Sequence, residues 1–127
     1  MYFPLVTTVS LGSATLLEFS RHRTSEGRLI DPQLIDPAEK FNFLLEPRSL
    51  LILKGSLYTQ HMHGIAERVE DDLESDRILN LMQCDEDLRR SRCLKRTSRI
   101  SLTIRHVPRL INSSAVKLLS NRLTFQR

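Results

Sequence analysis

The stretch from residue 44 to residue 65 constrains the fold of this chain more than any other. It contains a continuous apolar run at residues 50–53, which is bounded by Pro47 on one side and Gly55 on the other. Four apolar residues between such breakers are typical of a buried strand, because a helix needs a longer periodic segment. The first prediction is therefore a short buried strand that ends in a turn at Gly55.

Two histidines follow this turn, in a second extended segment that we expect to begin at Tyr58. His61 and His63 are two positions apart, so on a strand they share one face at a spacing of about 6.5–7 Å. A histidine such as His63, directly followed by Gly64, suits a metal ligand held on a rigid wall. The alternative is a pair of surface histidines beside a turn, and this stretch alone favours that alternative.

A second segment, residues 99–105, alternates strictly between apolar and polar side chains. Ile100, Leu102 and Ile104 share one face, and Arg99 and Arg105 lie at the two ends of the other. This alternation predicts a half-buried strand whose polar face is unusually cationic. Most polar faces of this kind are simply solvated, which is the alternative to a binding role.

Together the two segments resemble the AlkB family of iron(II)- and 2-oxoglutarate-dependent dioxygenases. That family carries its last iron-binding histidine in a His-Gly-Ile tripeptide, which matches residues 63–65. Further along it has a strand with two arginines six apart and Leu-Thr between them, which matches Arg99, Arg105 and residues 102–103. A closer resemblance to one branch of the family rests on residues 45–51, 58–66 and 101–109, and the whole resemblance covers residues 2–110.

The many short segments with Gly and Pro turns predict a β-sandwich or barrel. The resemblance implies a more definite fold: a mainly β chain forming a double-stranded β-helix, or jelly roll, that is incomplete at the N-terminus. We expect residues 1–110 to be the C-terminal part of such a domain, with insertions at about residues 20–40 and 67–97. Residues 111–127 would form a tail.

The resemblance also implies roles for individual residues. His63 would bind iron(II), Arg99 would bind the far carboxylate of 2-oxoglutarate, and Arg105 would lie nearer the metal. Six strand residues separate two Cα atoms by about 20 Å, and two arginines leaning together leave a gap about the length of a five-carbon diacid. The guanidinium fork can bind a carboxylate with two hydrogen bonds. The family often has Asn where Ser101 stands, so no contact is assigned to Ser101.

The remaining iron ligands of the family come from a His-x-Asp motif, which would lie before the segment matching residues 2–4. No His-x-Asp or His-x-Glu occurs at His22, His61, His63 or His106. The other 2-oxoglutarate ligands and the lid that recognises the nucleotide would also lie upstream. We therefore expect the C-terminal half of the domain, which by itself should bind iron weakly because three ligands are needed. His61 could add a ligand beside His63, but a surface substitution is the preferred interpretation.

Length and composition limit the other possibilities. A chain of 127 residues supports one domain at most. No apolar run approaches membrane-spanning length, and the N-terminal segment lacks the basic start of a signal peptide. We expect Cys84 and Cys93 to be reduced thiols of an intracellular protein, since they show no metal-finger spacing and no secretory context.

The other segments give coarser predictions. Residues 2–19 should form two strands, or one strand bent at Gly12. Residues 21–40 contain two Ile-Asp-Pro steps, which favour turns in an exposed loop. Residues 67–88 are acidic, with apolar residues spaced loosely enough for a solvated helix or a mobile insertion.

The predicted function is oxidative demethylation of alkylated nucleic acid or a related substrate, in the nucleus or the cytoplasm, by a monomer without membrane attachment. The chain carries a net charge of +4, and basic residues crowd positions 89–99. The rival hypothesis is a non-catalytic module that uses this basic block to bind RNA or DNA. A third is a fragment that does not fold alone, because half a jelly roll leaves long unpaired edges.

Overall fold

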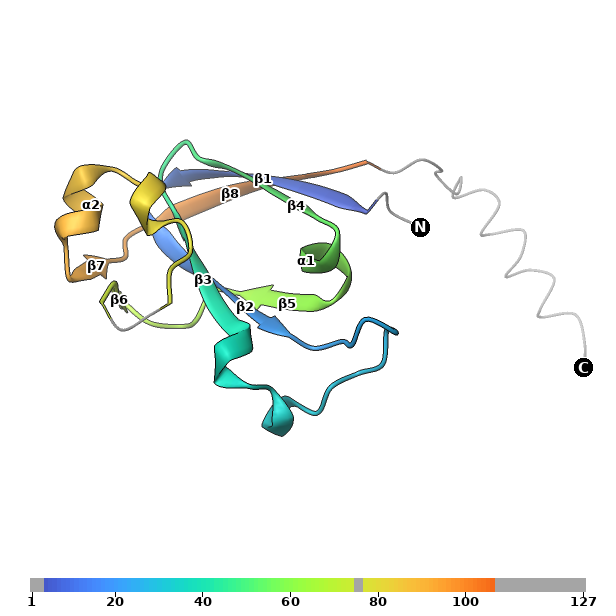
Figure 1. Cartoon of the computed structure of the whole chain (residues 1–127). Coiled ribbons are helices and arrows are strands. Elements are labelled where there is room, and N and C mark those ends of the chain that lie inside the picture. Colours follow the sequence, from blue (N-terminus) through green and yellow to red (C-terminus); the bar gives the residue numbers. More distant parts are fainter. Residues whose placement is uncertain (1–3, 75–76, 107–127) are drawn as a thin grey trace, which may run out of the picture.

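The computed structural model describes residues 4–74 and 77–106, and these residues form two facing three-stranded sheets and a smaller two-stranded sheet. Sheet A has the order β4-β1-β8 and sheet B has the order β3-β2-β5, and every pairing is antiparallel. Figure 1 shows the two sheets lying one above the other, with β6 and β7 beside the β1–β2 turn. The strands are β1 (Leu5–Gly12), β2 (Thr15–Arg21), β3 (Lys40–Leu45), β4 (Leu50–Lys54), β5 (His61–Gly64), β6 (Glu70–Asp72), β7 (Cys93–Lys95) and β8 (Arg99–Arg105).

The chain crosses between the two sheets repeatedly, as a jelly roll does. It runs through β1 in sheet A, β2 and β3 in sheet B, β4 in sheet A, β5 in sheet B and β8 in sheet A. Jelly rolls usually contain eight strands in two sheets. The mainly β, jelly-roll-like fold is confirmed, and among the described residues each main sheet has three strands.

The predicted bend at Gly12 is a sharp turn between two strands. Gly12 has a φ of 81°, which favours glycine. A Cβ there would lie 2.5 Å from the carbonyl oxygen of Ser98, so a side chain is also excluded by contact. This turn joins the two sheets at the end where β8 begins.

The connections contain only short helices. The loop between β2 and β3 holds two 3-10 turns, η1 (Pro32–Leu34) and η2 (Pro37–Glu39), each capped by the aspartate of an Ile-Asp-Pro step. The helix α1 (Ser56–Thr59) precedes β5, so Tyr58 is helical and the histidine strand begins at His61 rather than at Tyr58.

Of the two alternatives for residues 67–88, a solvated helix or a mobile insertion, the single helix is wrong. The described part of that segment contains β6, the 3-10 turn η3 (Leu81–Gln83) and the start of α2 (Glu86–Arg90). The apolar residues of this segment are spaced irregularly because they project onto sheet B from loops and short elements, and not from one face of a helix. We call these loops and short elements the cover. Ile78, Leu81, Leu88 and Leu94 pack on the outer face of sheet B.

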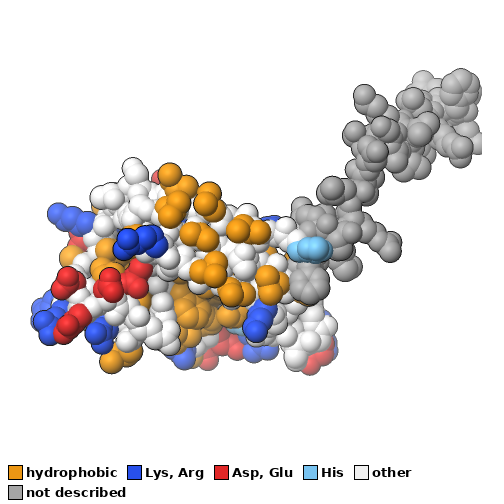
Figure 2. Space-filling model, turned by 90° about the horizontal axis from the view of Figure 1, so that it is seen from above, with side chains coloured by type: hydrophobic (Ala, Val, Ile, Leu, Met, Phe, Trp, Pro, Cys, Tyr) orange, Lys and Arg blue, Asp and Glu red, His pale blue; other side chains and the backbone are white. Residues whose placement is uncertain are grey.

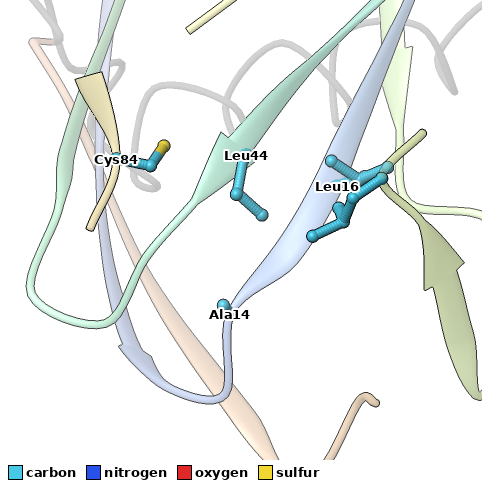
Figure 3. Packing of buried hydrophobic residues seen from close by; sticks show 5 residues of the cluster. Ala14, Leu16, Leu44 and Cys84 are labelled. Atoms are coloured by element: carbon cyan, nitrogen blue, oxygen red, sulfur yellow. The ribbon is translucent and has the colours of Figure 1, made fainter. Parts of the chain in front are cut away.

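Sheet B is covered on both faces. Its outer face holds a cluster of Ala14, Leu16, Leu44, Leu73 and Cys84, and Figure 3 shows four of these side chains gathered beside the strands. Its inner face holds a second cluster with sheet A, formed by Leu17, Phe19, Leu45 and Leu53. Asp71 ties the cover to the sheet: it is fully buried and accepts from the Leu16 N–H, from Arg96 and from Arg68.

Sheet A is covered on one face only, and this corrects two predictions. In β4 only Leu53 is buried, whereas Leu50 and Ile52 are 59% and 49% exposed. In β8 the apolar residues Ile100, Leu102 and Ile104 are 62%, 51% and 60% exposed. Figure 2 shows these apolar side chains as a patch over sheet A. Alternation predicts two faces but does not say which of them is covered.

Candidate active site between the sheets

The polar face of β8 turns toward the space between the sheets. Directly paired residues of an antiparallel sheet share a face. Arg105 pairs with Val6, and Ser101 pairs with Ser10. Val6 and Ser10 are both buried, with exposures of 7% and 1%. Arg99 and Arg105 therefore project from the inner face of sheet A, at opposite ends of β8.

His63 projects into the same space from sheet B. It pairs with Phe19 of β2, and its ring centroid lies 5.7 Å from that of Phe19. Phe19 is 1% exposed and belongs to the cluster between the sheets. The predicted shared face of the two histidines is present, since the His61 ring lies 5.7 Å from Phe41 and Phe41 stacks on Phe19.

The electrostatics connect His63 with Arg105. Burial lowers the pKa of His63, and the positive charge of Arg105 lowers that pKa further. A metal ligand has to be neutral imidazole, so a lowered pKa keeps His63 in the form that can bind a metal at neutral pH. Arg105 and His63 therefore influence each other although they come from opposite sheets.

Arg99 lies at the other end of the interior, in a drier environment. Its Nη2 donates to the Ser10 hydroxyl at 2.8 Å. Burial lowers the pKa of its guanidinium, and its Nε is buried without a partner among the described residues. No ion pair within residues 4–74 and 77–106 involves Arg99. A half-buried guanidinium without a carboxylate partner among the described residues is a candidate anion-binding group.

Arg99 lines a cavity of about 260 Å³, whose other walls are Ala14, Thr15, Ile65, Arg96 and Thr97. His63 borders a different cavity of about 520 Å³. That cavity is lined by Phe19 and also by Ser20 and Asn42, which alternate away from Phe19, so it extends around the edge of sheet B. The cavity at Arg99 contains the guanidinium and is therefore the candidate site for an acid.

The described residues do not form a metal site by themselves. No group of three or more His, Cys, Asp or Glu side chains with metal-binding geometry occurs among them. His61 is engaged through Nδ1, which lies 3.0 Å from the carbonyl oxygen of Ser56. Because a carbonyl only accepts, this Nδ1 carries the proton. A facial site needs two histidines and one carboxylate, so the residues described here do not complete an iron site by themselves.

The basic block at residues 89–99 is partly neutralised. Arg90 pairs with Glu86, Arg92 pairs with Glu74, and Arg96 pairs with the buried Asp71. No helix in the described part of the chain is long and apolar enough to span a membrane.

Two polar residues of this site were not predicted from the sequence. Ser10 and Thr15 are 1% and 2% exposed and lie near Arg99. Thr15 begins the alternating series Thr15, Leu17 and Phe19. The only feature of the sequence that could have pointed to Thr15 is therefore a hydroxyl at one end of an otherwise apolar strand face.

Comparison with known proteins agrees with this architecture. Two facing antiparallel sheets with a histidine on one and two inward arginines on the other define a jelly-roll protein with a candidate acid-binding interior. The chain is 36% identical over 114 residues to a protein of Danio rerio named "Probable RNA/DNA demethylase ALKBH6". The match covers 90% of this chain and 47% of the relative, so the chain spans about half the length of the relative it matches. No family model matches the chain.

This match agrees with the resemblance to the AlkB family that the His-Gly-Ile tripeptide and the arginine strand carry. The relative carries the name of the family's sixth homologue, the branch that residues 45–51, 58–66 and 101–109 resemble. A span of about half is consistent with the predicted C-terminal half of the domain. The predicted domain limits at residue 110, and a tail at 111–127, fall outside the described residues.

Proposed function

We propose that this chain supplies the 2-oxoglutarate-binding wall and one iron ligand of a dioxygenase that demethylates alkylated nucleic acid. The observation that carries the proposal is the orientation of β8, whose two arginines face the interior while its apolar side chains face outward. Arg99 is half-buried and Arg105 is exposed, so both guanidinium groups are accessible to an anion that enters the space between the sheets.

Three residues would have separate roles in this site. Arg99, at the closed end beside Ser10, would hold the far carboxylate of 2-oxoglutarate with a charge-assisted hydrogen bond. Arg105, at the end near His63, would face the carboxylate closer to the metal. His63 would hold iron through its neutral ring, and iron with 2-oxoglutarate would supply the oxidation chemistry. The remaining ligands would have to come from residues other than those described.

Nucleic acid is the proposed substrate because the relative is named an RNA/DNA demethylase. The nucleus or the cytoplasm is the corresponding location, and a monomer is the proposed state. Salt-dependent binding of RNA or DNA that survives His63→Ala would support the rival hypothesis of a non-catalytic basic module.

The test compares this chain with the same chain joined to the part of the relative that it does not span. The 127-residue chain should bind iron weakly and release no succinate coupled to substrate oxidation, whereas the joined protein should do both. In the joined protein, His63→Ala should abolish iron binding, and the matched control His61→Ala should keep it. Arg99→Ala should keep iron and require more 2-oxoglutarate. Full iron content and activity in the joined His63→Ala protein would contradict the proposal.

A further inference from the structure

Thr15 carries a buried hydroxyl that the fold itself does not use. It is the first residue of β2 and is 2% exposed. It pairs with Leu45 and therefore shares the inner face of sheet B with the apolar cluster between the sheets. Its Oγ1 has no hydrogen-bond partner among the described residues. Valine has the same shape and would avoid the cost of burying an unpaired hydroxyl, so the packing alone does not explain threonine here.

The second unpaired buried group at this end of the interior is the Nε of Arg99. Thr15 and Arg99 come from opposite sheets and line the same cavity of about 260 Å³. Both groups can donate a hydrogen bond, and the guanidinium adds a positive charge. The other cation in the cavity wall, Arg96, is already paired with Asp71. The cavity thus presents two donors and one uncompensated charge, which suits a carboxylate.

We infer that Thr15 donates a hydrogen bond from its hydroxyl to the same distal carboxylate of 2-oxoglutarate that Arg99 binds. This inference rests on the proposed function and adds a ligand from sheet B to the one expected from sheet A. A carboxylate held by both residues connects the two sheets at their closed end. It also makes recognition depend on the distal carboxylate and not only on the 2-oxo acid group.

The experiment is isothermal titration calorimetry of the full 127-residue chain with 2-oxoglutarate. Thr15→Val should weaken binding about tenfold to a hundredfold, which is the range for losing a hydrogen bond to a charged group. Thr15→Ser, which keeps the hydroxyl, should restore most of the affinity. Thr7→Val is the matched control, because Thr7 lies on the outer face of β1 and its hydroxyl donates to the Ile104 carbonyl at 3.5 Å. Its affinity should be unchanged.

A second ligand separates a direct contact from a structural effect. 2-Oxopentanoate keeps the 2-oxo acid group but lacks the distal carboxylate, so it should bind the unsubstituted chain and Thr15→Val equally weakly. Full affinity of Thr15→Val for 2-oxoglutarate, or failure of Thr15→Ser to restore it, would overturn the inference and leave the proposed function standing. No binding of 2-oxoglutarate to the unsubstituted chain would also overturn the inference, whereas the proposed function is decided separately by iron content and succinate release in the joined protein.

Discussion

Sheets A and B have the same number of strands but are buried differently. Sheet B lies between two apolar clusters, one shared with sheet A and one shared with the cover, which residues 65–74 and 77–98 form. Sheet A contacts sheet B on one face and exposes Leu50, Ile52, Ile100, Leu102 and Ile104 on the other. The stability of this chain is therefore concentrated on sheet B, while the candidate binding groups Arg99 and Arg105 lie on sheet A.

This difference shows how the site is separated from the core. Sheet B carries an apolar cluster on each face. The buried Asp71 of the cover is paired, whereas the buried Thr15 hydroxyl of β2 has no partner among the described residues. In β8 the inner face is polar instead, which leaves the interior available for a ligand. Because the polar side chains of β8 face inward, its apolar side chains face outward, and among the described residues nothing covers them.

The largest expected effect comes from cutting the contact between the cover and sheet B. Asp71→Ala should lower the free energy of unfolding by about 3–5 kcal/mol, because it leaves the largely buried Arg96 without its carboxylate. Urea denaturation followed by circular dichroism measures this change. Glu86→Ala is the control, since the Arg90–Glu86 pair is exposed and should contribute less than about 1 kcal/mol. Equal losses for both variants would contradict the role of Asp71.

The burial difference between the sheets can be tested by truncating one apolar residue on each. Leu16→Ala should cost about 2–5 kcal/mol, because Leu16 is fully buried between sheet B and the cover. Ile100→Ala, on the exposed face of sheet A, should change stability by no more than about 0.5 kcal/mol. The same denaturation measurement applies, and a cost for Ile100→Ala equal to that for Leu16→Ala would show that the outer face of sheet A is covered.

The smallest expected effect is a difference in reactivity between the two cysteine thiols of the cover. Burial, with smaller contributions from Glu46 and Asp85, raises the pKa of the Cys84 thiol to about 11. Cys93 is exposed, although a hydrogen bond with Glu70 raises the pKa of its thiol too. Iodoacetamide at pH 8 should therefore modify Cys93 first, as read by mass spectrometry, and Cys84 mainly after unfolding. Equal rates in the native protein would show that the cover does not protect Cys84.

The sequence predicted the strands better than their environments. The alternation of residues 99–105 and the breakers around residues 50–53 located β8 and β4, because these patterns are local. Which face of each strand is covered depends on the partner sheet, so the exposure of Ile100 and Leu50 could not be read from the pattern. The loose apolar spacing of residues 67–88 is compatible with a helix or with an insertion, because loops and short elements have no sequence period that would distinguish the two.

The candidate site followed from the sequence only in part. His63, Arg99 and Arg105 were selected by resemblance to the AlkB family, and the structure places all three on inner faces. Ser10 and Thr15 carried no motif, since a single hydroxyl on a strand is common and its burial depends on strands distant in sequence.

The central claim is that the two sheets bring His63 and Arg105 together in one interior. Nuclear magnetic resonance titration of the His63 ring tests it in the unsubstituted chain and in Arg105→Met. Desolvation and Arg105 both lower the pKa of His63, so the unfolded state binds more protons as pH falls below about 6.5. The associated stability is therefore present above that pH and is lost as pH falls. We predict a titration midpoint of His63 below its usual 6.5, and a higher midpoint in Arg105→Met. A midpoint at the usual value that stays the same in Arg105→Met would contradict the account.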